Sequence, residues 1–221
     1  IISKIYRNRS LVKLKLSSVN YCEMEDIILV NEEALSESFT PETLLHREGI
    51  IKEIARCLKP ALQNRSINNL FIIGPTGVGK TVVMKWLLKE QFNGNSVYIN
   101  CWNCRSEHKI LWEILHQRGF VVHGKESIEE LVRVLESLKK KIVICLDEAD
   151  QIEEPNILYT LARNGQGIIM ISNHSFLSWN LDNRIKSSLL LNEIEFKPYS
   201  QQELFNILKD RIGFAFKPES I

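Results

Sequence analysis

The residues best suited to chemistry lie in one glycine-rich segment. It reads Gly74-Pro75-Thr76-Gly77-Val78-Gly79-Lys80-Thr81, which matches the pattern of a phosphate-binding loop. Glycines allow the backbone to curl so that several N–H groups point inward at phosphate oxygens. We expect the Lys80 ammonium to reach the β- and γ-phosphates of a nucleotide and the Thr81 hydroxyl to bind Mg²⁺. The segment therefore predicts a site for ATP or GTP with magnesium.

The residues on either side of this segment favour the same interpretation. Residues 70–73 form a short apolar run that predicts a strand, and residues 80–91 predict a helix. A strand, a glycine-rich loop and a helix in this order are the context in which the pattern binds phosphate. The helix would add the positive end of its dipole beside the loop. The alternative is a glycine-rich turn that happens to end in Lys-Thr.

A second group of reactive side chains follows an apolar run at residues 142–146. Asp147, Glu148 and Asp150 come directly after that predicted strand. The carboxyl ends of parallel strands gather at one edge of a sheet, so these carboxylates should lie beside the phosphate loop. We expect Asp147 to hold magnesium together with Thr81, Glu148 to polarise the attacking water, and Asp150 to make local hydrogen bonds. The alternative is an acidic helix start after a buried strand.

A third group follows the apolar run at residues 168–172. Asn173 ends this predicted strand, where an amide would hydrogen-bond both the γ-phosphate and a water; the alternative is a simple turn-forming asparagine. Arg184 and Lys186 come next, at a position from which a neighbouring subunit would present a cation to the phosphates. Such an arginine finger stabilises charge in the transition state, whereas the alternative is a solvated helix face.

The elements that must position these residues alternate regularly along the chain. Predicted strands cover residues 70–73, 97–100, 142–146, 168–172 and 189–194, and predicted helices cover residues 80–91, 107–118, 127–140, 156–163 and 183–188. This alternation predicts an α/β fold with a three-layer parallel sheet. A helix over residues 42–58, capped by Thr40, opened by Pro41 and interrupted or ended by Pro60, precedes them. A capped helix over residues 200–212, with Ser200 and Glu203 as a capping box, follows.

Composition bounds the class of protein. The chain has 221 residues, 44% hydrophobic content and a net charge of +1. This suffices for one large or two small domains and gives no global basic field for nucleic acid. The five cysteines are irregularly spaced and predict reduced thiols in an intracellular protein. No apolar run predicts a membrane span. Residues 1–16 are basic and contain no acidic residue, which predicts a solvated arm or an arm that contacts nucleic acid.

A weaker pattern is formed by Cys101, Cys104 and His108, which resemble half of a zinc site. A closed zinc site needs four ligands, and the chain offers few candidates to complete the set. We expect ordinary thiols where a strand ends and a helix begins.

The motifs together resemble an AAA+ ATPase, and more narrowly the archaeal replication initiators related to the origin-recognition complex and the Cdc helicase loader. The resemblance covers roughly residues 38–216. Its specific parts are Leu181-Asp182-Asn183-Arg184-Ile185-Lys186-Ser187-Ser188-Leu189 and Phe196-Lys197-Pro198-Tyr199, with a further element at residues 39–48. The chain departs from the family at Asn183, where a proline is usual, and at Ser188, where eukaryotic relatives carry an arginine.

The resemblance implies roles for individual residues. Residues 74–81 and Asp147 would bind ATP or ADP with Mg²⁺, Glu148 and Asn173 would act in hydrolysis, and Arg184 would face a neighbouring subunit. His46 and Arg47 would border the adenine. The resemblance also implies an N-terminal extension at residues 1–37, an AAA+ core at 38–198 and the start of a helical lid at 199–221. The rest of the lid and a winged-helix domain would lie beyond this sequence.

The function implied is an ATP-dependent initiator of DNA replication that recognises origins and loads a helicase, with ATP binding and hydrolysis as a conformational switch. Its partners would be origin DNA, through the further domain, and the replicative helicase or a neighbouring initiator subunit, with no membrane. It would be cytoplasmic and nucleoid-associated. The alternative is a nucleotide-binding regulatory or interaction module that no longer initiates replication.

Overall fold

The computed structural model describes residues 29–217, except 37–38, 64, 66–67, 93, 139, 177–178 and 180. The chain divides into a large unit, Thr40–Ile207, and a small unit made of Ile1–Phe39 and Leu208–Ile221. The basic arm predicted over residues 1–16 lies outside the described residues. The domain boundaries at residues 37 and 198 stay a prediction.

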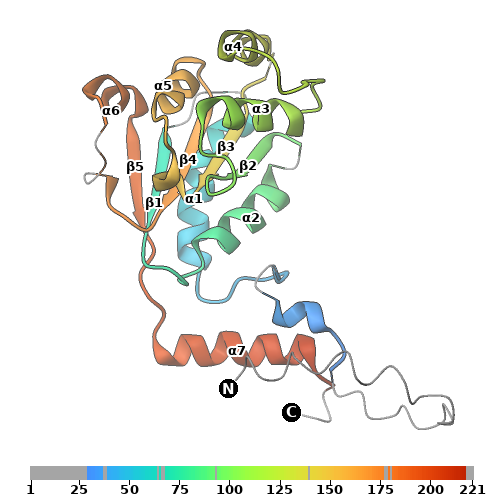
Figure 1. Ribbon diagram of the computed structural model, residues 1–221. Coiled ribbons are helices and arrows are strands. Elements are labelled where there is room, and N and C mark those ends of the chain that lie inside the picture. The colour runs from blue at the N-terminus through green and yellow to red at the C-terminus, as the bar shows by residue number, and fades with distance from the viewer. Residues whose placement is uncertain are drawn as a thin grey trace, which may run out of the picture. The chain divides into compact units, whose positions relative to one another are not determined.

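The large unit is built on a parallel sheet, as the alternating pattern predicts (Figure 1). Its strands are β1 (Asn69–Ile73), β2 (Ser96–Asn100), β3 (Val143–Asp147), β4 (Gly167–Ser172) and β5 (Leu191–Glu195). They lie in the order β2-β3-β4-β1-β5, and every neighbouring pair is parallel. All residues of β3 and β4 are buried, because both faces of these central strands are covered.

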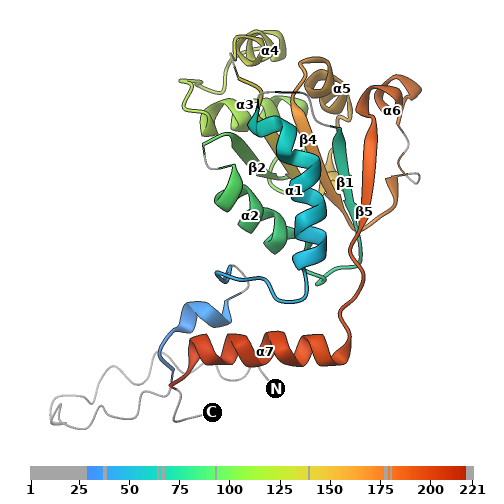
Figure 2. The ribbon, with the colours of Figure 1, turned by 180° about the vertical axis from the view of Figure 1, so that it is seen from behind.

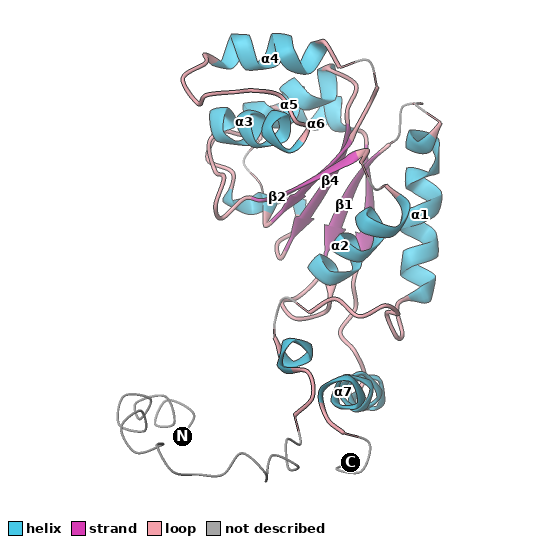
Figure 3. Ribbon diagram, turned by 90° about the vertical axis from the view of Figure 1, so that its right-hand side faces the viewer, coloured by secondary structure: helices cyan, strands magenta, loops and turns pink. Residues whose placement is uncertain are grey.

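Helices cover both faces of the sheet, which confirms the three-layer prediction. Those of the large unit are α1 (Glu48–Leu62), α2 (Lys80–Gln91), α3 (Glu107–Gln117), α4 (Ile128–Glu136), α5 (Asn156–Arg163) and α6 (Asn183–Leu189), followed by α7 (Gln201–Ala215), which continues into the small unit. Figure 3 shows α1 and α2 on one face and α3, α5 and α6 on the other, and Figure 2 shows α1 and α2 from the front. Two apolar cores result, one on each face of the sheet.

The helix predicted over residues 42–58 is partly wrong. The structure begins α1 at Glu48, and residues 42–47 form bends and turns. His46 has φ 60°, in the left-handed region, so a right-handed helix cannot run through it. Pro60 also does not end the helix, because α1 continues to Leu62, although the missing N–H of Pro60 leaves the Arg56 carbonyl without its usual helical donor.

Other boundaries differ less from expectation. The helix α4 ends at Glu136, short of residue 140, and β5 begins at Leu191. The predicted capping box at the start of α7 is confirmed, because Ser200 N donates to Glu203 Oε2 (2.7 Å) and Glu203 N donates to Ser200 Oγ (3.3 Å). None of the described helices is long and apolar enough to cross a membrane.

The small unit joins the end of α7 to residues before the large unit. A short 3₁₀ helix, η3, covers Glu32–Leu35. Arg211 on α7 donates from Nε to Ala34 O (2.7 Å) and from a terminal nitrogen to Ser36 O (2.6 Å). The rings of Phe39 and Phe214 lie 6.0 Å apart. These contacts hold Ala34, Ser36 and Phe39 against the last turns of the helix.

Candidate nucleotide site

The phosphate loop occupies the connection between β1 and α2, where the sequence places it. Residues 74–79 form this connection and α2 begins at Lys80. Gly79 has φ 88°, which favours glycine, and a Cβ there would lie 3.1 Å from the Tyr199 hydroxyl. A Cβ on Gly74 would collide with the carbonyl oxygen of Phe196. Both glycines are therefore required by the local backbone as well as by the expected approach of phosphates.

Lys80 is the buried cation at the centre of the site. Only 7% of it is exposed. Its Nζ donates to Gly74 O (2.7 Å), Pro75 O (2.8 Å) and Asn173 Oδ1 (2.8 Å). Burial lowers the pKa of Lys80, whereas the carboxylates of Glu148, Asp147 and Asp150 act to raise it. The ammonium thus sits among acceptors at the place where phosphate oxygens are expected.

Asp147 and Thr81 are brought into direct contact, as the magnesium prediction requires. Thr81 Oγ1 donates to Asp147 Oδ2 (2.7 Å), and Asp147 is 1% exposed. A hydroxyl and a carboxylate are the hard oxygen donors that Mg²⁺ takes, and Mg²⁺ completes its shell with phosphates and waters. The donor set therefore fits magnesium.

Glu148 and Asn173 form the hydrolytic pair of the prediction. Asn173 Nδ2 donates to Glu148 Oε2 (3.0 Å), so the Asn173 amide bridges Glu148 and Lys80. Burial, followed by the charges of Asp147 and Asp150, raises the pKa of Glu148. A raised carboxylate pKa makes Glu148 a better proton acceptor for water near neutral pH than an ordinary glutamate.

Asp150 acts as a local hydrogen-bonding partner, as expected from the sequence. Its Oδ1 accepts from Ser172 Oγ (3.1 Å), and its Oδ2 accepts from Gln151 Nε2 (2.9 Å). The bond from Ser172 joins the end of β4 to the segment that follows β3.

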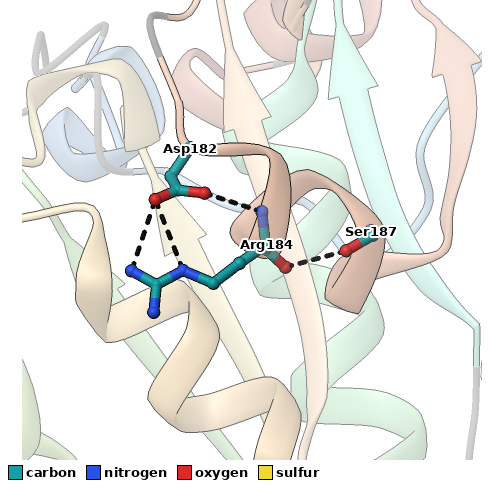
Figure 4. Close-up of polar contacts among 3 residues, drawn as sticks. All are labelled: Asp182, Arg184 and Ser187. Atoms are coloured by element: carbon teal, nitrogen blue, oxygen red, sulfur yellow. Dashed lines mark hydrogen bonds and ion pairs between the residues drawn. The ribbon is translucent and has the colours of Figure 1, made fainter.

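Arg184 stands apart from these residues on the exposed start of α6. Its side chain is 78% exposed, and its guanidinium lies 3.3 Å from the Asp182 carboxylate (Figure 4). Asp182 also caps α6 by accepting from Arg184 N (2.8 Å). Lys186 is exposed as well. Both cations therefore lie on the surface, and their expected role toward a neighbouring subunit stays a prediction.

Arg47 contacts the phosphate loop, whereas His46 contacts α7. Arg47 is 6% exposed and donates to Val78 O and Lys197 O, each at 2.9 Å. His46 Nε2 lies 3.2 Å from Asn206 Nδ2. Their contact with an adenine stays a prediction.

The half zinc site finds no support in the described part of the chain. No group of three His, Cys, Asp or Glu residues there could hold a metal ion. Cys101 and Cys104 pack in the apolar core, and His108 Nε2 bonds to Glu126 O (2.8 Å).

Tyr98 is a site residue that the sequence analysis missed. Its hydroxyl donates to Asp147 Oδ2 (2.6 Å), beside the bond from Thr81. Tyr98 pairs with Cys145 across β2 and β3, so its side chain shares a face with Asp147 two residues further on. Burial and the hydrogen bond to Asp147 raise the pKa of Tyr98, which therefore keeps its proton to donate. The only signal in the sequence is a tyrosine inside an otherwise apolar strand.

We predict that Tyr98→Phe lowers the affinity of the nucleotide site for magnesium. Without its second donor, Asp147 is less firmly oriented, and residues that orient a metal ligand typically contribute about 10-fold or more to affinity. Titration with a fluorescent ADP at increasing Mg²⁺ should show that about 10-fold more Mg²⁺ is needed, whereas binding in EDTA is unchanged. Tyr159→Phe, on α5, is the matched control. An unchanged Mg²⁺ midpoint in Tyr98→Phe would show that this hydroxyl has no such role.

Comparisons with known proteins agree with this geometry. A family model described as an AAA domain matches residues 64–178. The ORC1-type DNA replication protein 1 of Sulfurisphaera tokodaii is 36% identical over 209 residues, covering 86% of this chain and 52% of that protein. The crystal structure of Cdc6p from Pyrobaculum aerophilum matches with a TM-score of 0.74 and 25% identity, over 86% of this chain and 55% of that one.

A further match is the Aeropyrum pernix ORC1 protein in complex with DNA, with a TM-score of 0.73 and 29% identity, over 86% of this chain and 55% of that one. The chain thus spans about half the length of the curated relatives it matches. From the parallel sheet, the phosphate loop and these matches together, the chain belongs to the AAA domain family.

Proposed function

We propose that this chain is the ATP-binding part of a DNA replication initiator, in which ATP binding and hydrolysis act as a conformational switch. The observation that carries the proposal is one connected set of polar contacts. Asn173 joins Lys80 to Glu148, and Thr81 joins the phosphate loop to Asp147. The set combines a phosphate-binding cation, a magnesium ligand pair and a base for water.

Each residue has a distinct task in this proposal. Lys80 would bind phosphate oxygens in place of the loop carbonyls that it now contacts, and Thr81 and Asp147 would hold Mg²⁺. The metal supplies neutralisation of phosphate charge. Glu148 would orient a water and take its proton as the water oxygen attacks the γ-phosphorus, the bond from that phosphorus to the β-phosphate oxygen breaks and ADP leaves. Asn173 would hold the Glu148 carboxylate in place. We expect turnover to be slow, as for a switch.

The alternative is a module that binds nucleotide without hydrolysing it. The hydrogen bond between Asn173 and Glu148, together with the raised pKa of Glu148, favours hydrolysis, because a binding-only site needs neither. A module would retain only the contacts of Lys80 and Thr81.

The relatives support the wider role. The curated relatives are named ORC1-type DNA replication proteins, and the matched Aeropyrum pernix ORC1 structure is a complex with DNA. We therefore propose origin DNA as a partner of the longer protein, along with a replicative helicase or a neighbouring initiator subunit. A place in the cytoplasm, at the nucleoid, follows from the same proposal.

We predict that Lys80→Ala removes most nucleotide affinity. The variant loses the cation expected to pair with the phosphates, and charge-assisted bonds of this kind account for at least about 10-fold in affinity. Titration with fluorescent ATP measures the dissociation constant, and Lys89→Ala, on the exposed face of α2, is the matched control. Equal affinity in Lys80→Ala and the wild type would remove the basis of the proposed site.

We also predict that Arg184→Ala lowers ATP turnover without lowering ATP affinity. An arginine presented across a subunit contact stabilises transition-state charge, and its loss should cost about 10-fold or more in turnover. Mixing Arg184→Ala with Glu148→Gln should restore part of the turnover, because each subunit supplies what the other lacks. Lys89→Ala, on the exposed face of α2, serves as the control. Wild-type turnover by Arg184→Ala at every protein concentration would rule out this role.

A further inference from the structure

Arg47 is a buried cation whose contacts the proposed hydrolysis does not use. Its guanidinium donates to two backbone carbonyls, Val78 O in the phosphate loop and Lys197 O in the segment between β5 and α7. In the described part of the chain, ion pairs join Arg105 to Glu153 and Arg184 to Asp182, and none includes Arg47. A buried charge without an acidic partner is costly, so its position calls for an explanation.

The bond to Val78 fixes one peptide unit of the phosphate loop. In a trans peptide the C=O of one residue and the N–H of the next point in opposite directions, and the chain has no described cis bond. By holding the Val78 carbonyl behind the loop, Arg47 turns the Gly79 N–H toward the opposite side, where phosphates are expected. A cation on the carbonyl also polarises the peptide and strengthens that N–H as a donor.

The same guanidinium is held by residues 196–199. It stacks over the Tyr199 ring at 3.8 Å and lies 5.3 Å from the centre of the Phe196 ring. These residues also approach the loop directly. The space that a Cβ on Gly79 would need is bounded by the Tyr199 hydroxyl, and the space beside Gly74 is filled by Phe196. Arg47 therefore connects two segments that are already in close contact.

We propose that Arg47 is a positioning residue that aims the Gly79 N–H at bound phosphate and ties the phosphate loop to residues 196–199. Nucleotide binding would then order the segment that leads into α7. The inference rests on the proposed nucleotide site. It adds that nucleotide bound at the phosphate loop orders residues 196–199 through the contacts of Arg47. It gives a shared structural role to two elements singled out in the sequence, residues 39–48 and Phe196-Lys197-Pro198-Tyr199.

The test compares Arg47→Met and Arg47→Lys with the wild type in the full chain. Fluorescent ATP titration measures affinity, and hydrogen exchange with and without ATP and Mg²⁺ measures protection of peptides that cover residues 191–204. The matched control is Arg105→Met, because Arg105 also stacks on an aromatic ring, Trp102 at 4.6 Å, and donates to its carbonyl (3.4 Å). Thermal unfolding monitors folding, and Tyr199→Leu provides a second variant if Arg47→Met does not fold.

We expect Arg47→Met to bind ATP at least about 10-fold more weakly, since one loop donor is no longer oriented. Arg47→Lys should lie between Arg47→Met and the wild type, because an ammonium keeps the charge but lacks the fork that reaches both carbonyls. ATP should protect residues 191–204 in the wild type and in Arg105→Met, but not in Arg47→Met or Tyr199→Leu.

Wild-type affinity in Arg47→Met would overturn the inference and leave the proposed function intact. Weaker binding with unchanged ATP-dependent protection would overturn the coupling to residues 196–199. A wild-type chain without ATP affinity would instead remove the proposed function, and this inference with it.

Discussion

A buried ammonium at the carboxyl edge of the sheet is the constraint on which the rest of the large unit depends. Lys80 is almost fully buried, and an ammonium in that position is stable only if acceptors surround it. Two loop carbonyls and the Asn173 amide supply direct bonds, and nearby carboxylates supply opposite charge. Phosphate oxygens also accept hydrogen bonds, and they carry more negative charge than the carbonyl and amide oxygens that now contact Lys80. The arrangement that stabilises Lys80 is therefore also one that suits a polyphosphate.

The strand order provides this arrangement. The strands β3, β4 and β1 are adjacent and parallel, so their carboxyl ends lie next to one another. Asp147 and Glu148 come from the first, Asn173 from the second and the phosphate loop from the third. The register of β3 and β4 pairs Leu146 with Met170, and this pairing fixes where the polar residues that follow each strand begin. The apolar interior of the sheet is thus what sets the geometry of the polar site.

Much of this could be predicted from the sequence, because the signals are local. The phosphate loop lies within one strand–loop–helix unit, and the acidic and amide side chains directly follow apolar strands. The sequence does not reveal the site contacts of residues whose partners are set by strand register or lie on distant segments. Tyr98 reaches Asp147 only because β2 pairs with β3 in one register.

Arg47 shows the same limit, because its partners Val78 and Lys197 lie 31 and 150 residues away in the sequence. The predicted start of α1, at residue 42, was wrong for a different reason. Residues 42–47 carry helix-compatible side chains, but the left-handed backbone of His46 diverts the chain before Glu48. In both cases contacts with the rest of the fold override local preference.

The most direct test of the central claim is a crystal structure with a non-hydrolysable ATP analogue and Mg²⁺. The account predicts that Lys80 Nζ leaves the Gly74 and Pro75 carbonyls for phosphate oxygens, with the metal held by Thr81 and Asp147 and with Glu148 beside the γ-phosphate. A nucleotide bound elsewhere, or one bound at the loop while Lys80 keeps its carbonyl contacts, would contradict the account.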